Sequence, residues 1–183
     1  EPDETQASRM VAAVMPVYEG FYQLKAPPES IQEAIRLSRR YLKERCLPDS
    51  AINLLDRTLA AVRAMQDTSG ALVQALHKEL SSLIDQESLQ LTDLQWFHRQ
   101  MMERLGALLS ARLHTSAEVS KISAVAEWET YLQQLLEQLD NLAGARLEEV
   151  TPADLAIMIA AITGIPLGKV RLQERERLVS MEQ

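Results

Sequence analysis

The sequence has few of the residues that build disulfide-bonded, β-rich or membrane-spanning proteins. Its one cysteine, Cys46, excludes an internal disulfide and favours a reducing compartment. Aromatic residues make up only 4% of the chain and glycine is rare, whereas Leu, Ala, Gln and Glu are common, which favours helices over strands. Because no apolar run approaches the length of a bilayer span, we expect no membrane insertion.

The chain also lacks the signals of several site types. A net charge of −7 argues against a nucleic-acid interface, which usually needs a basic patch. His77, His98 and His114 do not have the i, i+3 or i, i+4 spacing of metal ligands on a helix, so we predict no metal site. No GxxxxGK[ST] segment occurs, so no phosphate-binding loop is expected here. We interpret Cys46 as a small buried side chain.

The first 65 residues predict a small unit of three helices. We expect a helix over residues 3–17, a second that begins at Pro27-Pro28, and a third that begins after Pro48 with Asp49 as its N-cap. The predicted buried faces are Met10, Val11, Val14 and Val17; Ile31, Ala34, Ile35, Ser38, Tyr41 and Leu42; and Ala51, Ile52, Leu55, Leu59 and Val62.

The middle of the chain has a different, heptad-like spacing and no proline from residue 71 to residue 143. We expect residues 67–70, DTSG, to break the preceding helix, and Thr92 or Asp93 to cap a later one. Turns are expected near residues 85–91 and 114–117. Two or three antiparallel helices would then form a coiled-coil-like arm. The three predicted stripes are Leu72, Leu76, Leu80 and Leu83; Leu94, Phe97, Met101, Leu105 and Leu108; and Ile122, Val125, Leu132, Leu136 and Leu139. Trp96, Phe97 and Trp128 are expected to hold the arm helices together, or else to bind a partner if they are exposed.

The segment after residue 150 predicts a well-capped helix. Thr151 is the expected N-cap, Pro152 the first helical residue and Asp154 the capping-box acid, while Gly164 ends the helix. Val150 is expected to pair as a short strand with Leu24. The predicted fold is therefore mainly α: a small helical domain with a minimal strand pair, interrupted by the inserted helical arm.

Three segments of the sequence resemble, in order, segments of Clp-type AAA+ unfoldases. They are "EPDETQASRM…YEGFYQLK", "RRYLKERCLPDSAINLLDRTLAAVR" and "VTPADLAIMIAAITGIPLGKVRLQERERLVSMEQ". The resemblance implies that residues 1–66 and 148–168 form the small lid subdomain of the first ATPase module. Residues 67–147 would be the inserted middle domain, and residues 169–183 the linker and start of the second module. Since the chain does not begin with Met, we interpret it as a piece of a longer protein.

The same resemblance implies a nucleotide contact at the LPD corner. It assigns Pro48, Asp49 and Ile52 to a wall beside the adenine of bound nucleotide; the residues alone equally fit a plain helix–helix corner. The parent protein would use ATP with magnesium, whereas the chain alone would bind no cofactor and hydrolyse no ATP. The sequence differs from the family pattern at Ser50, Arg57 and Ile162, where the family usually carries Lys, an acid and Trp.

The resemblance also implies the partners. These are neighbouring subunits of a homo-hexameric ring in the cytoplasm, protein substrates, and an adaptor or partner chaperone on the arm, with no nucleic acid and no membrane. An alternative within the family is the ATPase that disassembles the type VI secretion sheath, which the segment Leu54-Leu55-Asp56 weakly suggests. An alternative of another class is a free-standing helical interaction module without ATPase activity.

Overall fold

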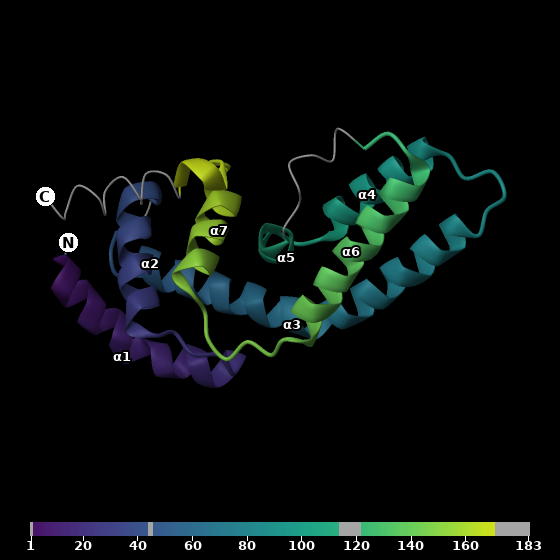
Figure 1. The fold of residues 1–183 in the computed structure, drawn as a ribbon. Helices are drawn as coiled ribbons and strands as arrows, with labels where there is room; N and C mark the ends of the chain where they lie inside the picture. The colour runs from purple at the N-terminus through teal and green to yellow at the C-terminus, as the bar shows by residue number, and fades with distance from the viewer. Residues whose placement is uncertain (1, 44–45, 114–121, 171–183) are drawn as a thin grey trace, which may run out of the picture. The chain divides into compact units, whose positions relative to one another are not determined.

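The computed structural model describes residues 2–43, 46–113 and 122–170 (Figure 1). The chain divides into two compact units: residues 1–63 with 147–183, and residues 64–146. The first unit is therefore discontinuous in sequence, and its two segments flank the second unit. We call them unit 1 and unit 2.

Unit 1 contains the helices α1 (Glu4–Tyr22), α2 (Pro28–Tyr41) and α7 (Pro152–Thr163), together with the first turns of α3 (Asp49–Ile84). The helix α2 packs against both α1 and α7. Among the described residues of unit 1, the buried apolar side chains are aliphatic or methionine, and no aromatic ring is buried. The fully buried side chains include Leu24, Leu37, Leu54, Leu55 and Leu59.

A single parallel bridge between Lys25 and Glu149 joins the two segments of unit 1. The Lys25 amide donates to the Glu148 carbonyl at 2.8 Å, and the Val150 amide donates to the Lys25 carbonyl at 2.9 Å. The buried Ser30 hydroxyl also donates to the Val150 carbonyl at 2.8 Å. The minimal strand pair is thus confirmed, one residue away from the predicted Leu24–Val150 pairing.

The capping of α7 follows the sequence prediction closely. Thr151 is the N-cap, and its amide and hydroxyl both lie 2.9 Å from the Asp154 carboxylate. Pro152 is the first helical residue, and Gly164 ends the helix at a φ of 71°, a region that glycine enters without steric penalty.

The prediction for α1 was wrong in its length and, apart from Val11, in its buried face. The helix continues through Pro16 to Tyr22, where the Gln23 side chain donates to the Gly20 carbonyl at 2.7 Å. The residues that face the interior are Ala7, Val11 and Met15. Apolar residues surround most of this helix, so their spacing alone did not determine which side is buried. The exposed apolar side chains are Met10, Val14, Val17 and Phe21.

Unit 2 contains the later turns of α3 together with α4 (Leu91–Arg104), α5 (Ala107–Arg112) and α6 (Val125–Gly144). These helices share one core, and Figure 1 shows α4 and α6 alongside α3. The buried residues are Val73, Leu76, Leu80, Leu94, Phe97, Met101, Leu105, Leu109, Leu113, Trp128, Tyr131, Leu132, Leu135, Leu136 and Leu139. The predicted leucine stripes of the arm are largely confirmed.

The predicted break at residues 67–70 is wrong, because α3 runs through them without interruption. The Thr68 hydroxyl donates to the Ala64 carbonyl at 2.7 Å, so this polar side chain is satisfied within the helix. A break does occur at Gly106, between α4 and α5, where the second predicted stripe seemed continuous. Gln90 is the N-cap of α4, with Asp93 accepting from the Gln90 amide at 3.0 Å. The turn expected near residues 114–117 lies outside the described residues.

Candidate functional site

The corner before α3 is held by backbone hydrogen bonds within the corner itself. The amides of Ser50, Ala51 and Ile52 donate to carbonyls of Cys46 and Pro48, at 3.0–3.1 Å. Pro48 accepts the first bond of the helix, so it occupies the N-cap position, and Asp49 is the first helical residue instead of the predicted cap. The peptide bond between residues 47 and 48 is cis.

The three residues predicted to contact nucleotide are not alike in exposure. Pro48 and Ile52 are half-buried and lie one helical turn apart, whereas Asp49 is exposed. Because the amides of residues 50–52 already have backbone partners, they are not free to bind a ligand. What the corner offers is a small apolar surface formed by Pro48 and Ile52, with a carboxylate beside it.

Cys46 is exposed, which overturns our prediction of a buried thiol. The neighbouring Leu47 is buried instead, at 5% exposure, and it anchors the corner in unit 1. Cys46 lies in the loop between α2 and α3, and it is the next residue, Leu47, that packs into the interior of unit 1.

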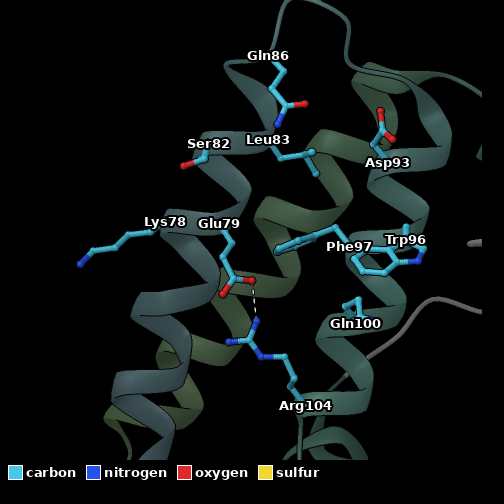
Figure 2. A pocket seen from close by; sticks show the side chains of 10 residues that line it. All are labelled: Lys78, Glu79, Ser82, Leu83, Gln86, Asp93, Trp96, Phe97, Gln100 and Arg104. Atoms are coloured by element: carbon cyan, nitrogen blue, oxygen red, sulfur yellow. Dashed lines mark hydrogen bonds and ion pairs between the residues drawn. The ribbon is translucent and has the colours of Figure 1, made fainter.

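Unit 2 carries a groove around Trp96, between α3 and α4 (Figure 2). The Trp96 side chain is 63% exposed, while its neighbour Phe97 is buried in the core. Figure 2 shows Phe97 extending from α4 toward α3. Phe97 therefore packs between the helices, whereas Trp96 lies at the surface of the groove. The groove has a volume of about 500 Å³. Its lining is Lys78, Glu79, Ser82, Leu83, Gln86, Asp93, Trp96, Phe97, Gln100 and Arg104.

An ion pair spans the groove from one helix to the other. Arg104 Nη1 of α4 lies 2.6 Å from Glu79 Oε2 of α3. Both side chains are well exposed, so the pair contributes little to stability. It does set charges of both signs beside an exposed indole ring, an arrangement that suits a protein surface better than a small apolar molecule.

Three rings meet at the joint between α4 and α6. The His98 ring lies 5.6 Å from the Trp128 ring and 5.7 Å from the Tyr131 ring. The Trp128 indole donates to the Ile122 carbonyl at 3.3 Å. Burial lowers the pKa of His98 and raises the pKa of Tyr131, because both charged forms lose hydration. Phe97 and Trp128 thus pack inside the arm as predicted, and Trp96 does not.

The other histidines do not gather into a site. His77 Nε2 lies 2.7 Å from Asp140 Oδ2 and joins α3 to α6. His114 lies outside the described residues. Within the described ranges, no group of three His, Cys, Asp or Glu side chains is arranged to hold a metal ion. Nor does any helix there combine the length and apolar character needed to cross a bilayer.

The helical unit closed by residues 148–150, with its LPD corner, defines the class of this chain. A family model described as the AAA lid domain matches residues 3–106, and the chain belongs to this family. Its relatives are Clp/Hsp100 proteins, as the resemblance predicted.

Two curated relatives match the chain over its whole length. Chaperone protein ClpC1, chloroplastic, of Arabidopsis thaliana is 27% identical over 183 residues, which are 100% of this chain and 18% of that protein. The ATP-dependent Clp protease ATP-binding subunit ClpC of Staphylococcus aureus is 26% identical over 182 residues, 20% of its length. The chain therefore spans about a fifth of the length of these relatives.

A solved structure has a similar fold. The S. cerevisiae Hsp104-ADP complex aligns with a TM-score of 0.51 and 20% sequence identity, covering 100% of this chain and 33% of that one. The likeness supports the fold, a helical AAA lid with a helical arm.

Proposed function

We propose that this chain is the regulatory part of an ATP-dependent Clp-type protein unfoldase. Unit 1 would be the small lid subdomain of the first ATPase module, and unit 2 the inserted middle domain. The observation that carries the proposal is the match of the AAA lid domain model to residues 3–106, in a chain whose compact unit closes again at residues 147–150. Residues 169–183 would lead into the second module.

In this proposal the parent protein binds ATP with magnesium, and the lid contributes one wall of that site. Pro48 and Ile52 fit an adenine ring, because both are apolar and only half-buried. Asp49 is exposed and would stand at the edge of the wall. The chain has no GxxxxGK[ST] segment, so the phosphates and the metal ion would be held by other parts of the parent, and the chain alone would not hydrolyse ATP.

Unit 1 offers a surface for the neighbouring subunit of a homo-hexameric ring. The exposed side chains of Met10, Val14, Val17 and Phe21 follow at intervals of four, three and four residues, so they form one stripe along α1. We call them the α1 stripe. Four large apolar residues exposed on one helix face are unusual for a surface that stays in water. A second copy of the parent chain is the occupant that we propose.

Unit 2 would regulate this machine by taking a protein partner, an adaptor or a chaperone, at the groove around Trp96. Tryptophan is enriched among the residues that dominate binding at protein interfaces, and charged side chains are typical of the rim around them. A cytoplasmic location remains a prediction.

The proposal is tested by deleting residues 67–147 from the full-length parent. We expect basal ATP hydrolysis to remain largely intact, because the arm supplies no part of the phosphate site. Coupling should change: the stimulation of ATPase by substrate protein, or the rate of unfolding of a fluorescent substrate, should differ clearly from the intact parent. Loss of basal ATPase in a variant that still forms its ring would contradict the proposal.

A Trp96→Ala variant of the parent tests whether regulation depends on the groove itself or on other parts of the arm. Because Trp96 is largely exposed, its removal should leave the fold of unit 2 unchanged while reducing partner-dependent stimulation. Glu129→Ala is the matched control, since that residue lies on α6 and does not line the groove. Equal stimulation in both variants would rule out the groove as the docking surface.

The two alternatives are less well supported. The relatives named above carry chaperone and protease-subunit names, which does not favour the ATPase of the type VI secretion sheath. A free-standing interaction module without ATPase is not favoured by membership of the AAA lid domain family.

A further inference from the structure

Unit 1 contains a second cavity that the proposed lid function does not use. It lies where the end of α2, the first turns of α3 and the end of α7 meet, and its volume is about 430 Å³. That volume is within the range of pockets that hold small molecules. The polar side chains in its wall are Tyr41, Lys43, Ser50, Asn53, Arg57 and Thr163.

The cavity and the apolar corner lie on different sides of α3. Ser50, Asn53 and Arg57 are spaced i, i+3 and i+7, so they share one face of the helix. Ile52 lies two residues from Ser50, about 200° around the helix axis. A ligand in the cavity would therefore not occupy the surface formed by Pro48 and Ile52.

Among the described residues, the charged side chains that line the cavity are both cationic. Lys43 and Arg57 line it, and no described Asp or Glu does, although the chain as a whole carries a net charge of −7. Neither cation makes a hydrogen bond or ion pair with another described residue. Both are exposed, so they can turn toward an anion that enters the cavity.

Ser50 is the buried polar group of the wall. Its side chain is 1% exposed, and its hydroxyl has no hydrogen-bond partner within the described part of the chain. Buried hydroxyls nearly always have one, so this hydroxyl is available to a polar group that enters the cavity. The Thr163 hydroxyl, by contrast, already donates to the Ile159 carbonyl at 2.7 Å.

We propose that this cavity binds a small organic phosphate. A guanidinium, an ammonium, a hydroxyl and an amide are the groups that recognise phosphate oxygens. Leu42 and Ile162 complete the wall with apolar surface for the organic part of the ligand. The inference stands on unit 1 alone and does not depend on the proposed unfoldase activity.

The test is isothermal titration calorimetry of the 183-residue chain with ribose 5-phosphate, with ribose and inorganic phosphate as the two partial ligands. We expect ribose 5-phosphate to bind more tightly than inorganic phosphate, and ribose not to bind. Arg57→Gln should weaken binding by about tenfold or more, the effect of losing one charge-assisted hydrogen bond. Arg9→Gln, which removes an exposed cation of α1, should leave the affinity unchanged.

The variant Ser50→Ala distinguishes a role of Ser50 in ligand binding from a role in the stability of the fold. Removing an unpartnered buried hydroxyl should leave the ligand-free chain at least as stable in thermal unfolding, while it weakens binding of ribose 5-phosphate. The proposal is overturned if no heat is observed up to about 10 mM ligand. It is equally overturned if Arg57→Gln and Arg9→Gln bind alike, or if Ser50→Ala binds as the parent sequence does.

Discussion

Tyr22, at the end of α1, donates a hydrogen bond from its hydroxyl to Asp56 of α3 at 2.8 Å. This hydrogen bond to Asp56 holds the proton on the Tyr22 hydroxyl and raises the pKa of Tyr22, and burial raises it further by a smaller amount. Since the unfolded chain ionises first, the stabilisation is complete below about pH 10 and is lost as the pH rises through the higher folded value.

We therefore predict that Tyr22→Phe lowers the free energy of unfolding by about 0.5–1 kcal/mol at neutral pH, since the pair is only partly buried. It should also weaken the alkaline loss of stability. Urea unfolding across the alkaline range measures both effects. In a double-mutant cycle, the double variant Tyr22→Phe/Asp56→Asn should cost less than the sum of the two single variants if the two side chains are coupled; full additivity would show that they are not.

His98 is the residue whose protonation should matter at acidic pH. Its folded pKa is lowered by burial, so the unfolded chain binds a proton first as the pH falls below about 6.5. The stability that depends on neutral His98 is full above that pH and declines below it. We predict that His98→Phe, which keeps a ring beside Trp128 and Tyr131, reduces the difference in unfolding free energy between about pH 7.5 and about pH 5.5.

Tryptophan fluorescence can follow this transition, because the Trp128 ring packs against His98. His77→Gln serves as the control: it removes an exposed histidine from the same unit. If His98→Phe and the parent sequence lose equal stability on acidification, burial of neutral His98 does not govern the acid response of unit 2.

Single positions also show what sequence alone could reveal. The departures from the family pattern at Ser50, Arg57 and Ile162 were visible in the sequence, but only the fold brings these three side chains to one cavity. The exposure of Cys46 could not be predicted either, because one buried leucine beside it was enough to occupy the interior. Spacing identifies a helix face; it does not say which neighbour covers it.

At the scale of one element, substitution by alanine should have opposite effects on the free energy of unfolding at two glycines, one inside α3 and one at the end of α7. Gly70 lies inside α3 and Gly164 ends α7 at a φ of 71°, and an added Cβ would meet open space at both. We predict that Gly70→Ala raises the free energy of unfolding by about 0.5–1 kcal/mol. Gly164→Ala should lower it by about 1–2 kcal/mol, because alanine is strained in the left-handed region.

Urea unfolding of both variants provides the comparison, each serving as the control for the other. A stability change of the same sign in both would mean that local backbone conformation does not decide the outcome. The helix α3 is continuous through residues 67–70, where we predicted a break. Polar residues and a glycine permit a break, but the packed leucines on either side favour a helix more strongly. Capping, in contrast, is a local interaction, so the ends of α7 were predictable.

At the scale of the whole molecule, the α1 stripe leads to a prediction about assembly. If a neighbouring subunit covers the stripe, Val17→Asp in the full-length parent should shift the ring toward smaller species, because a carboxylate would be desolvated at the interface. Ala12→Asp is the matched control, an exposed residue of α1 away from the stripe. Sedimentation velocity in the presence of ATP measures the ring population. Identical populations for both variants would show that the stripe does not contact another subunit.

The architecture was more predictable than the sites. Helical spacing, the caps and the paired segments near residues 25 and 150 were sufficient for a helical unit interrupted by a helical arm, because each depends on local or strongly patterned contacts. The groove around Trp96 and the cavity beside Ser50 depend on which side chains from different helices meet, and a one-dimensional pattern does not contain that information.

The bridge between Lys25 and Glu149 has a consequence for how the chain folds while the ribosome is still synthesising it. The paired residues are 149 − 25 = 124 positions apart, so α1 and α2 emerge long before the segment that completes their unit. During that interval the face of α2 that packs against α7 has no cover. Folding of residues 64–146 in the meantime would shorten the loop that remains to be closed. A chain that stops within the arm would therefore leave the ribosome as an unfinished helical unit with an open apolar face, a ready target for proteases and for aggregation.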